Sequence, residues 1–411
     1  MMVMKKIMVL AGGNDQVALI EELRRYLNGK VEILLVDMSD KVRAIPYADK
    51  FLPISTMDKE AVLKAAKEEK IDYILTACGD QPLSTMAYVS AQMGLPCYLT
   101  EEEVQNLTNK LYMKKMMVQN GIPTAKHISI SKDWDKSLLN GFKYPLVVKP
   151  VDSNGSKGVK KVMDEDELEN SLEEAFFYSL SGDAIIEEYK EGVELSVDVY
   201  VEDTTAKLLS VTTSRKIKQN TKSFTIVQSC YPAEVDYNEN EVLAIAQKIV
   251  DVFGLKNTPL LVQMIQGKDE LNVVEFSARM GGGSKYHLIK VLSGVDIMKV
   301  YVSMVMGEKP HVQPAKQVNT ALMSYVYCYP GTYCKLGNFD ELLASGGIND
   351  YFVYRLPVAE MTKSETSSDR VAGFLVVGDS WEDVNVKMAK ANSKLQVLNK
   401  ENQDIMRHDF Y

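Results

Sequence analysis

The strongest chemical signal in the sequence is a glutamine and a glutamate twelve residues apart, Gln263 and Glu275. Each lies in an apolar run, and a short polar stretch separates the runs, so residues 260–266 and 271–276 are predicted to pair as a β-hairpin. A carboxylate on an otherwise apolar surface needs a cation, because an unpaired buried charge is too costly to keep ionised. Arg279 is one candidate cation, and a hard metal such as Mg²⁺ is another, since it binds carboxylate and amide oxygens.

The metal site and the ion pair require different arrangements of this hairpin. Side chains alternate between the two faces of a strand, so one face is predicted to carry Leu271, Val273, Glu275, Ser277 and Arg279. For Gln263 and Glu275 to lie opposite each other, the connection between the strands must then have an odd length of three or five residues. The alternative is a structural ion pair between Glu275 and Arg279, with Gln263 facing solvent.

A second signal is a serine- and glycine-rich turn that follows an apolar strand ending in a lysine. Such turns expose backbone N–H groups that can surround a phosphate, and lysine side chains add positive charge. The turn is not a Walker A motif, because the spacing does not fit and no helix follows directly. The candidate phosphate contacts are Lys149, Ser153, Asn154, Gly155, Ser156 and Gly158. The alternative is a flexible hairpin loop with a solvated Lys157.

Lysines and acids elsewhere in the middle of the chain suit a nucleotide. Lys149 follows four apolar residues and must extend to water or meet an anion, of which we favour the anion. Lys110 opens a helix predicted over residues 109–120, with Thr108 as its N-cap. An apolar strand ends in acids that could bind an adenosine, although glutamates of this kind are usually solvated. These strand-end residues are Glu187, Glu188, Tyr189 and Glu194.

Arg279 is followed by three glycines, and the pair of features could stabilise negative charge that develops at a reaction centre. Gly282, Lys285 and His287 are candidate substrate contacts, because they lie in or just after this segment. An isolated histidine is more often structural than catalytic. No Ser-His-Asp or Cys-His arrangement supports nucleophilic catalysis.

These residues must be positioned by an α/β architecture with three regions. In residues 1–105, strand and helix patterns alternate, which predicts a parallel Rossmann-like sheet, although the full dinucleotide fingerprint is absent and NAD is not expected. Residues 106–312 form a second α/β region that contains both signals, with a mobile lid at about 125–190. From 313 to 411 the pattern is mixed α+β.

Composition excludes several classes of function. The 411 residues carry a net charge of −9, which disfavours nucleic-acid binding, because that affinity comes from basic patches. No apolar run reaches the length of a membrane span, and no secretory signal is expected, so we predict a cytoplasmic protein. The five cysteines are scattered, and they indicate neither a zinc site nor a disulfide framework.

The order of the signals resembles the ATP-grasp superfamily: a lysine, a lysine with a glycine loop, an acidic strand end, a Gln/Glu hairpin, and Arg-x-Gly-Gly-Gly. The resemblance covers most of the chain and implies a Rossmann-like domain, an ATP-grasp domain and a C-terminal α+β domain. It implies that Lys110 and Lys149 bind ATP phosphates under the loop Ser153–Gly158.

The resemblance also implies roles for the remaining residues. The adenine hinge would comprise Glu187, Glu188 and Tyr189, and Glu194 would hold the ribose. Gln263 and Glu275 would hold Mg²⁺ or Mn²⁺, and Arg279 would act on the phosphoryl group. Many relatives have asparagine where this chain has Ser277, a weaker ligand, which puts a second metal in doubt.

The function implied is an ATP- and Mg²⁺-dependent ligase that activates a small carboxylate as an acyl phosphate for attack by an amine. An amino acid is the favoured carboxylate, and a homodimer is common in the family. A glycinamide-ribonucleotide-synthetase-like or carbamoyl-phosphate-synthase-like reaction is the alternative enzyme. A non-catalytic nucleotide-binding regulator is the alternative outside enzymes.

Overall fold

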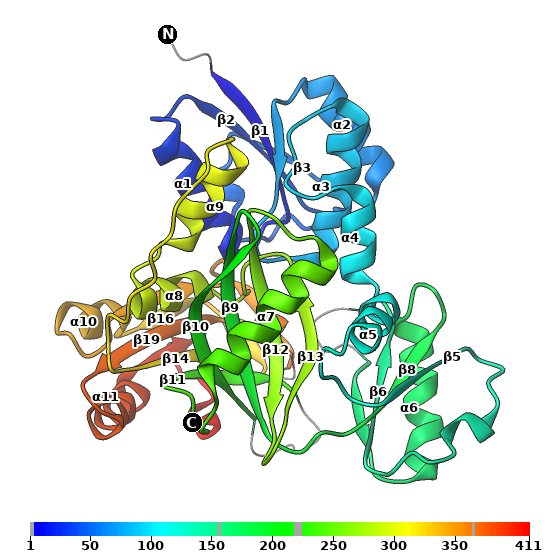
Figure 1. Ribbon diagram of the computed structural model, residues 1–411. Coiled ribbons are helices and arrows are strands. Elements are labelled where there is room, and N and C mark those ends of the chain that lie inside the picture. Colours follow the sequence, from blue (N-terminus) through cyan, green and yellow to red (C-terminus); the bar gives the residue numbers. More distant parts are fainter. Residues whose placement is uncertain (1–3, 154–157, 218–223, 364–365) are drawn as a thin grey trace.

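The computed structural model describes residues 4–153, 158–217, 224–363 and 366–411 (Figure 1). In Figure 1 the amino-terminal region lies at the top, and a small sheet with one helix lies at the lower right. A large sheet runs from the centre into the carboxy-terminal region at the lower left. The predicted mixed α/β fold class is confirmed.

The amino-terminal region is built on a parallel four-stranded sheet in the order β3-β2-β1-β4. Its strands are β1 (Lys5–Leu10), β2 (Val31–Val36), β3 (Lys50–Leu52) and β4 (Tyr73–Leu75). The helices that cover it are α1 (Asn14–Tyr26), α2 (Lys59–Glu69) and α3 (Asp80–Met93). The first two strands are fully apolar over their last four residues and are buried there. Because the strands are parallel, the turns that follow their carboxyl ends meet at one edge of the sheet.

Two helices connect this region to the next. Helix α4 (Glu101–Thr108) begins with a capping box between Thr100 and Glu103, and α5 (Lys110–Gln119) follows directly. The predicted cap at Thr108 is wrong. The Thr108 hydroxyl donates to the carbonyl of Val104 inside α4, and the Asn109 side chain accepts from the N–H of Tyr112 as the cap of α5.

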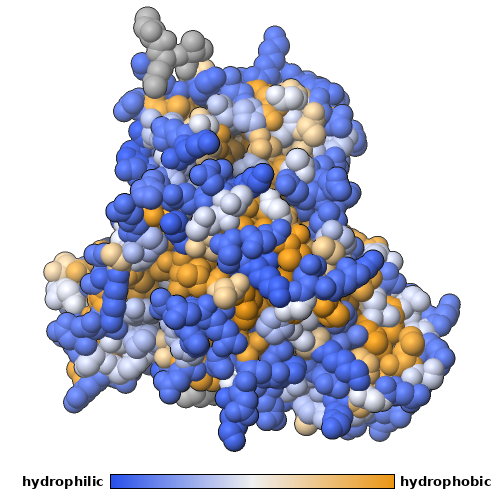
Figure 2. Space-filling view, viewed as in Figure 1, coloured by the Kyte–Doolittle hydropathy of each residue, from blue (hydrophilic) through white to orange (hydrophobic). Residues whose placement is uncertain are grey.

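The predicted lid contains a separate sheet in the order β5-β8-β6-β7, covered by helix α6. Its elements are β5 (His127–Ile130), β6 (Leu146–Pro150), β7 (Lys160–Val162), α6 (Glu165–Tyr178) and β8 (Ala184–Glu188). All four strands pair antiparallel, and all five residues of β6 are buried. Figure 2 shows an apolar patch at the lower right, where Figure 1 places this sheet, and further apolar surface at the centre and left of the same face.

The central sheet has eight strands in the order β13-β12-β9-β10-β11-β14-β19-β17. Five come from the middle of the chain: β9 (Val193–Glu202), β10 (Thr205–Lys216), β11 (Ile226–Tyr231), β12 (Thr258–Gln266) and β13 (Leu271–Ser277). Three come from the carboxy-terminal region: β14 (Thr320–Val326), β17 (Asp350–Val353) and β19 (Ala372–Gly378). Residue 313 is the predicted start of the carboxy-terminal region. Since β14 lies after it and pairs with β11, which lies before it, one hydrogen-bonded sheet contains strands from both regions.

Helices and short strands complete the fold. The helices are α7 (Glu239–Phe253), α8 (Lys285–Ser293), α9 (Ile297–Val305), α10 (Phe339–Ala344) and α11 (Trp381–Lys394). Two short antiparallel pairs are β15 (Gly331–Tyr333) with β18 (Ala359–Met361) and β16 (Lys335–Gly337) with β20 (Gln396–Leu398). Within the described ranges, no helix combines the length and the apolar character needed to cross a membrane.

The β12–β13 hairpin forms, but its connection is not of odd length. Gln266 pairs with Leu271, so four residues join the strands. A β-bulge at Val274 inserts one extra residue and brings Glu275 opposite Gln263. The bulge also reverses the faces before it, so the prediction that Leu271 and Val273 share the face of Glu275 is wrong: both are buried in the core beneath the sheet.

The start of β9 depends on one glycine. Gly192 has φ +153°, and a Cβ there would lie 2.3 Å from the backbone oxygen of Gln266 at the end of β12. We expect Gly192→Ala to lower the free energy of unfolding by about 3 kcal/mol, because backbone must shift to relieve the clash. Chemical denaturation measures this change. Gly182→Ala is the control, since Gly182 also has positive φ (+80°) but nothing lies within 4 Å of its Cβ position. Equal losses for the two variants would contradict the expected close packing.

Candidate active site

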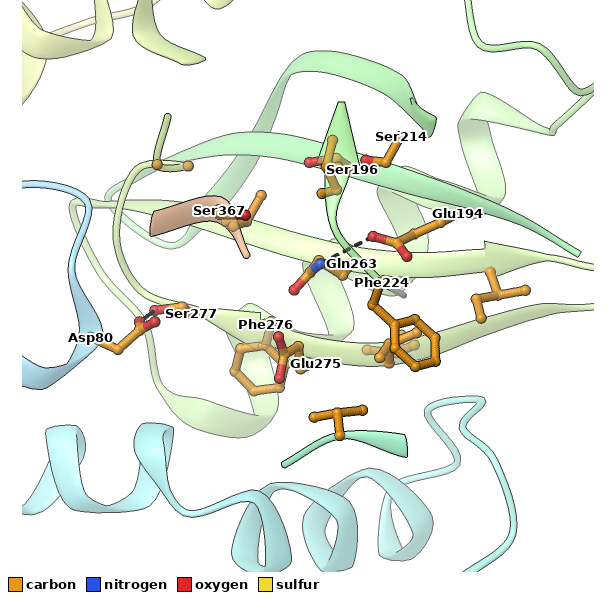
Figure 3. Close-up of a pocket in the computed structure, with 18 of the residues that line it drawn as sticks. Asp80, Glu194, Ser196, Ser214, Phe224, Gln263, Glu275, Phe276, Ser277 and Ser367 are labelled. Carbon is orange, nitrogen blue, oxygen red and sulfur yellow. Dashed lines mark hydrogen bonds between the residues drawn. The ribbon is translucent and has the colours of Figure 1, made fainter. Parts of the chain in front are cut away.

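A single cavity of about 900 Å³ lies where the amino-terminal region, the lid sheet and the central sheet meet. Its walls include the turn after β4, the start of α5, strands β6 and β8, and the hairpin β12–β13. The carboxy-terminal segment before β19 closes one side. Most of the residues selected from the sequence line this cavity, so the fold brings together segments more than 150 residues apart. Figure 3 shows part of it, with Asp80, Glu194, Gln263 and Glu275 from four different segments.

Lys149 meets an anion, as predicted, and that anion is a protein carboxylate. Its Nζ lies 2.8 Å from Oε2 of Glu187, and Lys114 Nζ lies 3.2 Å from Oε1 of the same side chain. All three side chains are buried: Lys149 is 6% exposed, Glu187 5% and Lys114 2%. Two lysines and one carboxylate leave a net positive charge at this end of the cavity. A site of this kind attracts a further anion.

Burial and pairing oppose each other in this cluster. Burial alone raises the pKa of Glu187, but the charges of Lys114 and Lys149 outweigh it and lower that pKa to about 2. Burial lowers the pKa of Lys114 to about 8, and Glu187 offsets only part of the effect. Glu187 therefore stays ionised throughout the neutral range, whereas Lys114 titrates just above it.

Lys114 was not selected from the sequence, because it stands inside the amphipathic pattern of α5. It also connects the lysine cluster to the hairpin. Its Nζ donates to Oγ1 of Thr124 over 2.6 Å, and that hydroxyl donates to the carbonyl of Val273 over 2.8 Å. Val273 precedes the bulge that positions Glu275. A chain of contacts therefore runs from Lys149 through Glu187, Lys114 and Thr124 to Val273, which lies two residues before Glu275.

The glycine loop is described only at its ends. Lys110 Nζ donates to the carbonyl of Ser153 over 2.5 Å, so helix α5 contacts the start of the loop. Gly158 has φ +70°, and a Cβ there would lie 2.9 Å from the Pro150 side chain. Lys110, Lys149 and Ser153 line the cavity. Asn154, Gly155, Ser156 and Lys157 lie outside the described residues.

The strand end at β8 faces the cavity through Glu187, Glu188 and Tyr189. The Glu187 carboxylate is held by the two lysines, so its side chain is not turned toward a base. The N–H groups of Glu188 and Tyr189 donate to backbone carbonyls, and the Lys161 ammonium lies 3.7 Å from the centre of the Tyr189 ring. This strand end supplies backbone, an aromatic ring and a carboxylate at the cavity wall.

Gln263 and Glu275 lie side by side at the other end of the cavity (Figure 3). Gln263 Nε2 donates to Oε1 of Glu194 over 3.2 Å, and Lys216 pairs with the other Glu194 oxygen at 2.6 Å. The amide therefore directs its oxygen away from Glu194. The Glu275 carboxylate is half-buried and has neither a hydrogen bond nor an ion pair with any residue that the structure describes.

The donor set here fits Mg²⁺. A carboxylate oxygen and an amide oxygen are ligands that this ion accepts, and Glu275 has no competing protein partner in the described ranges. Those ranges contain no cluster of three or more His, Cys, Asp or Glu residues that could form an all-protein metal site. Mg²⁺ usually binds one or two carboxylates and fills its other positions with water and substrate phosphates. Ser277 is committed elsewhere, because its hydroxyl donates to Asp80.

Arg279 forms an ion pair with Asp80 rather than with Glu275, so the structural Glu275–Arg279 pair is not formed. Its Nε and Nη2 donate to the two Asp80 oxygens over 2.9 and 2.7 Å. Burial opposes both charges, but the pair outweighs it, raising the pKa of Arg279 and lowering that of Asp80. Asp80 opens α3 after β4, at the sheet edge where α/β proteins bind ligands. The polar turn after this strand is the signal by which the sequence could have indicated Asp80.

The three candidate substrate contacts differ in their positions. Gly282 lies at the cavity wall. Lys285 is buried, and its Nζ lies 2.9 Å from Asp198 and donates to hydroxyls of Ser196 and Thr212. His287 does not line the cavity. It pairs with Asp350 at 2.7 Å and stacks on Phe352, which fits a structural role.

The carboxy-terminal wall was not anticipated from the sequence. Arg370, Tyr325 and Ser367 line the cavity, and Figure 3 shows Ser367 on the same side as Ser196 and Gln263. These residues follow the hairpin by 50 to 100 positions. No local motif marks them, because the pairing of β14 and β19 with β11 brings them there.

Comparisons with known proteins agree with this geometry. The model of the ATP-grasp domain family matches residues 142–286. The phosphoribosylamine–glycine ligase of Methanosphaera stadtmanae is 25% identical over 316 residues, which cover 69% of this chain and 70% of that protein.

Two solved structures have similar folds. The L-amino acid ligase of Bacillus licheniformis has a TM-score of 0.77 at 20% identity, over 97% of this chain and 100% of that one. The biotin carboxylase domain of the Hydrogenobacter thermophilus 2-oxoglutarate carboxylase has a TM-score of 0.80 at 17% identity, over 99% and 93%. The family match covers strands β6, β7 and β8, the acidic strand end and the Gln/Glu hairpin. The turn after β4, the start of α5 and the segment before β19, which also line the cavity, lie outside it. Residues 142–286 therefore form a domain of the ATP-grasp family.

Proposed function

We propose that the protein is an ATP- and Mg²⁺-dependent ligase that activates a small carboxylate as an acyl phosphate and transfers the acyl group to an amine. The observation that carries this proposal is one cavity with unlike ends. One end has lysines with excess positive charge, and the other has Glu275, without a partner among the described residues, beside Gln263 and Arg279. ATP can span such a cavity, with its phosphates running from the lysines toward the hairpin. We expect the reaction to occur in the cytoplasm.

The residues divide the work of phosphoryl transfer. Lys110 and Lys149 hold the phosphates, and Gln263 and Glu275 supply the oxygens that hold Mg²⁺. The metal neutralises charge on the phosphates when it is bound. A carboxylate oxygen of the substrate attacks the γ-phosphorus while the bond to the β-phosphate oxygen breaks, and ADP leaves. The amine nitrogen then attacks the acyl carbon, inorganic phosphate leaves, and the amine loses a proton.

Arg279 is placed to stabilise the transferring oxygens, and Asp80 fixes its orientation by a bidentate ion pair. A guanidinium that is already hydrogen-bonded on one edge needs no reorganisation when charge develops near its remaining N–H groups. The amino-terminal region thereby supplies a residue that positions the reaction centre, although its own sheet lies outside the cavity.

The carboxylate favoured here is an amino acid. One candidate substrate pair is glycine with phosphoribosylamine, the substrates in the name of the Methanosphaera stadtmanae relative. Another is a pair of amino acids. A release assay for inorganic phosphate, run with ATP, Mg²⁺ and each candidate pair, tests the proposal. Phosphate release that requires both a carboxylate and an amine supports the ligase. MgATP binding without release for any pair supports the regulator.

Glu275→Gln is expected to abolish Mg²⁺-dependent turnover. A direct metal ligand should contribute at least as much as outer residues do, so we expect a loss of at least about 100-fold in kcat. The unfolding midpoint should stay within about 2 °C of wild type, because the Glu275 side chain has no hydrogen bond or ion pair to lose among the described residues. Asp269→Asn is the matched control, since Asp269 is exposed in the same hairpin connection. Near-normal activity of Glu275→Gln would rule out this metal ligand.

The Lys114 charge predicts a pH dependence of nucleotide binding. Below its pKa of about 8, Lys114 is an ammonium that adds positive charge near the phosphates, and above it that charge is lost. Affinity for MgADP should therefore fall as pH rises from 7 to 9. The expected change is about fivefold, the effect of one partly screened charge. Titration calorimetry at several pH values measures it.

Lys114→Met should bind MgADP more weakly at pH 7 and show little further change up to pH 9. Lys136→Met is the control, because Lys136 lies exposed on the lid and pairs with Glu165 and Glu169. If Lys114→Met keeps the full pH dependence of the wild type, another group causes it.

A further inference from the structure

Arg370 is a buried cation in the wall of the cavity. It lies just before β19 in the carboxy-terminal region and is 8% exposed. Its guanidinium carbon lies 3.5 Å from the centre of the Tyr325 ring, and both residues line the cavity. A charge at this depth requires compensation, since transfer from water is costly unless the charge is paired.

The protein contacts of Arg370 are all neutral. Nε donates to the Tyr327 hydroxyl over 3.1 Å, and Nη2 donates to the backbone oxygen of Ile226 over 3.2 Å. These contacts use two of the five N–H groups of a guanidinium. Throughout the described ranges, no carboxylate oxygen lies within ion-pair distance of Arg370. Nη1 has no hydrogen-bond acceptor in the same part of the chain.

Arg370 differs from most other cations of the cavity in its lack of a carboxylate partner among the described residues. Almost every other lysine or arginine in the described lining has a carboxylate partner: Lys114, Lys149, Lys190, Arg215, Lys216, Arg279 and Lys285. Lys110 is the exception besides Arg370, and it is a candidate for the ATP phosphates. Lys110 and Lys149 come from the lid side of the cavity, whereas Arg370 comes from the β19 side (Figure 1). Arg370 therefore lies away from Lys110 and Lys149 and has no carboxylate partner in the described chain.

The glycine segment after Arg279 lets the Arg370 guanidinium lie against its backbone, and Gly281, Gly282 and Gly283 line the cavity together with Arg370. A Cβ on Gly283 would lie 2.4 Å from Nη1 of Arg370, so any side chain there would displace the guanidinium. Asp15, in the first turn of α1, contacts this segment, because its Oδ1 accepts the N–H of Ser284 over 3.0 Å. Burial raises the pKa of Asp15, and the charge of Arg370 lowers it through space. Asp15 and Arg370 form no ion pair in the described chain.

We propose that Arg370 binds an anionic oxygen group, a carboxylate or a phosphate, of the substrate that occupies the Gly281–Gly283 side of the cavity. A planar guanidinium with free N–H groups binds both kinds of group in a bidentate manner, and Tyr325 fixes its plane. The proposal extends the proposed function by giving one of the two substrates an anionic group apart from the reacting centre. Arg370 is thus a specificity residue of the substrate half of the site.

Binding of simple anions tests this role without requiring turnover. The protein saturated with MgADP is titrated with acetate and, separately, with inorganic phosphate, and the dissociation constant of each is measured from the shift in unfolding temperature. We expect at least one anion to bind, with Arg370→Met weakening it at least about tenfold, the effect of losing a charged hydrogen bond. MgADP affinity should change less than twofold. The anion that depends on Arg370 identifies the group as a carboxylate or a phosphate.

Two further variants keep the test decisive if Arg370→Met folds poorly. Arg370→Lys retains the charge but not the bidentate fork and should weaken the anion several-fold. Arg355→Met is the matched control, because Arg355 bonds the nearby Ser368 carbonyl but does not line the cavity. It should bind the anions as the wild type does.

The proposal is overturned if neither anion binds the wild type, or if Arg370→Met and Arg370→Lys both bind as the wild type does. Phosphate bound beside ADP at Lys110 and Lys149 would produce that second result. The outcome is separable from the ligase assignment. Loss of anion binding without any turnover supports the site alone, whereas turnover with unchanged anion binding supports the ligase alone.

Discussion

The buried Lys114–Glu187–Lys149 cluster is the interaction on which the site depends most. A carboxylate shared by two ammonium groups in the protein interior keeps all three charged, yet it cannot neutralise both cations. The remaining positive charge is what makes a polyanion a suitable ligand. The same cluster determines where the ligand must lie, because Lys114 is tied through Thr124 to the strand that carries Glu275. Charge and position at the two ends of the cavity are therefore set by one network.

The hairpin gives the second constraint, which is one of register. With four residues between the strands and a regular ladder, Val274 rather than Glu275 would lie opposite Gln263. Val273 pairs with Met264 before the bulge and is buried in the core, and its carbonyl accepts from the Thr124 hydroxyl. The bulge at Val274 then brings Glu275 opposite Gln263, so one strand carries both a proposed metal ligand and a contact of the lysine network. Bulges of this kind are frequent next to active sites, because they redirect one side chain without breaking the sheet.

Much of the site could be predicted from the sequence, since its signals are local. A lysine after four apolar residues, a glycine-rich turn, and two polar side chains in paired strands can each be found by spacing. The individual ligand contacts are proposals. The bulge could not be predicted, because an extra residue in a strand leaves no composition signal in this apolar run. The same is true of Lys114, which has the spacing of an ordinary core-facing helix position.

Long-range partners could not be predicted for a different reason. Asp80 meets Arg279, and Arg370 meets Tyr325, only after strands distant in the sequence have paired. Their positions depend on sheet order, and sheet order is not encoded in any short window. His287 illustrates the opposite error. Its place beside the glycine segment suggested a substrate contact, whereas the helix turns it toward Asp350 and Phe352.

The continuity of the central sheet has a consequence for how the protein can change shape. Strands β12 and β13 carry Gln263 and Glu275, and strand β19 follows Arg370, so a single hydrogen-bonded framework holds both. The lid sheet, which carries Lys149 and Glu187, shares no strand with that framework in the described chain. Relative motion of the two sheets would alter the distance between the lysines and the Gln263–Glu275 pair, while Gln263, Glu275 and Arg370 would stay fixed relative to one another. The substrate would then bind to a rigid framework, the central sheet, and only the lysines on the lid sheet would move to fit the nucleotide.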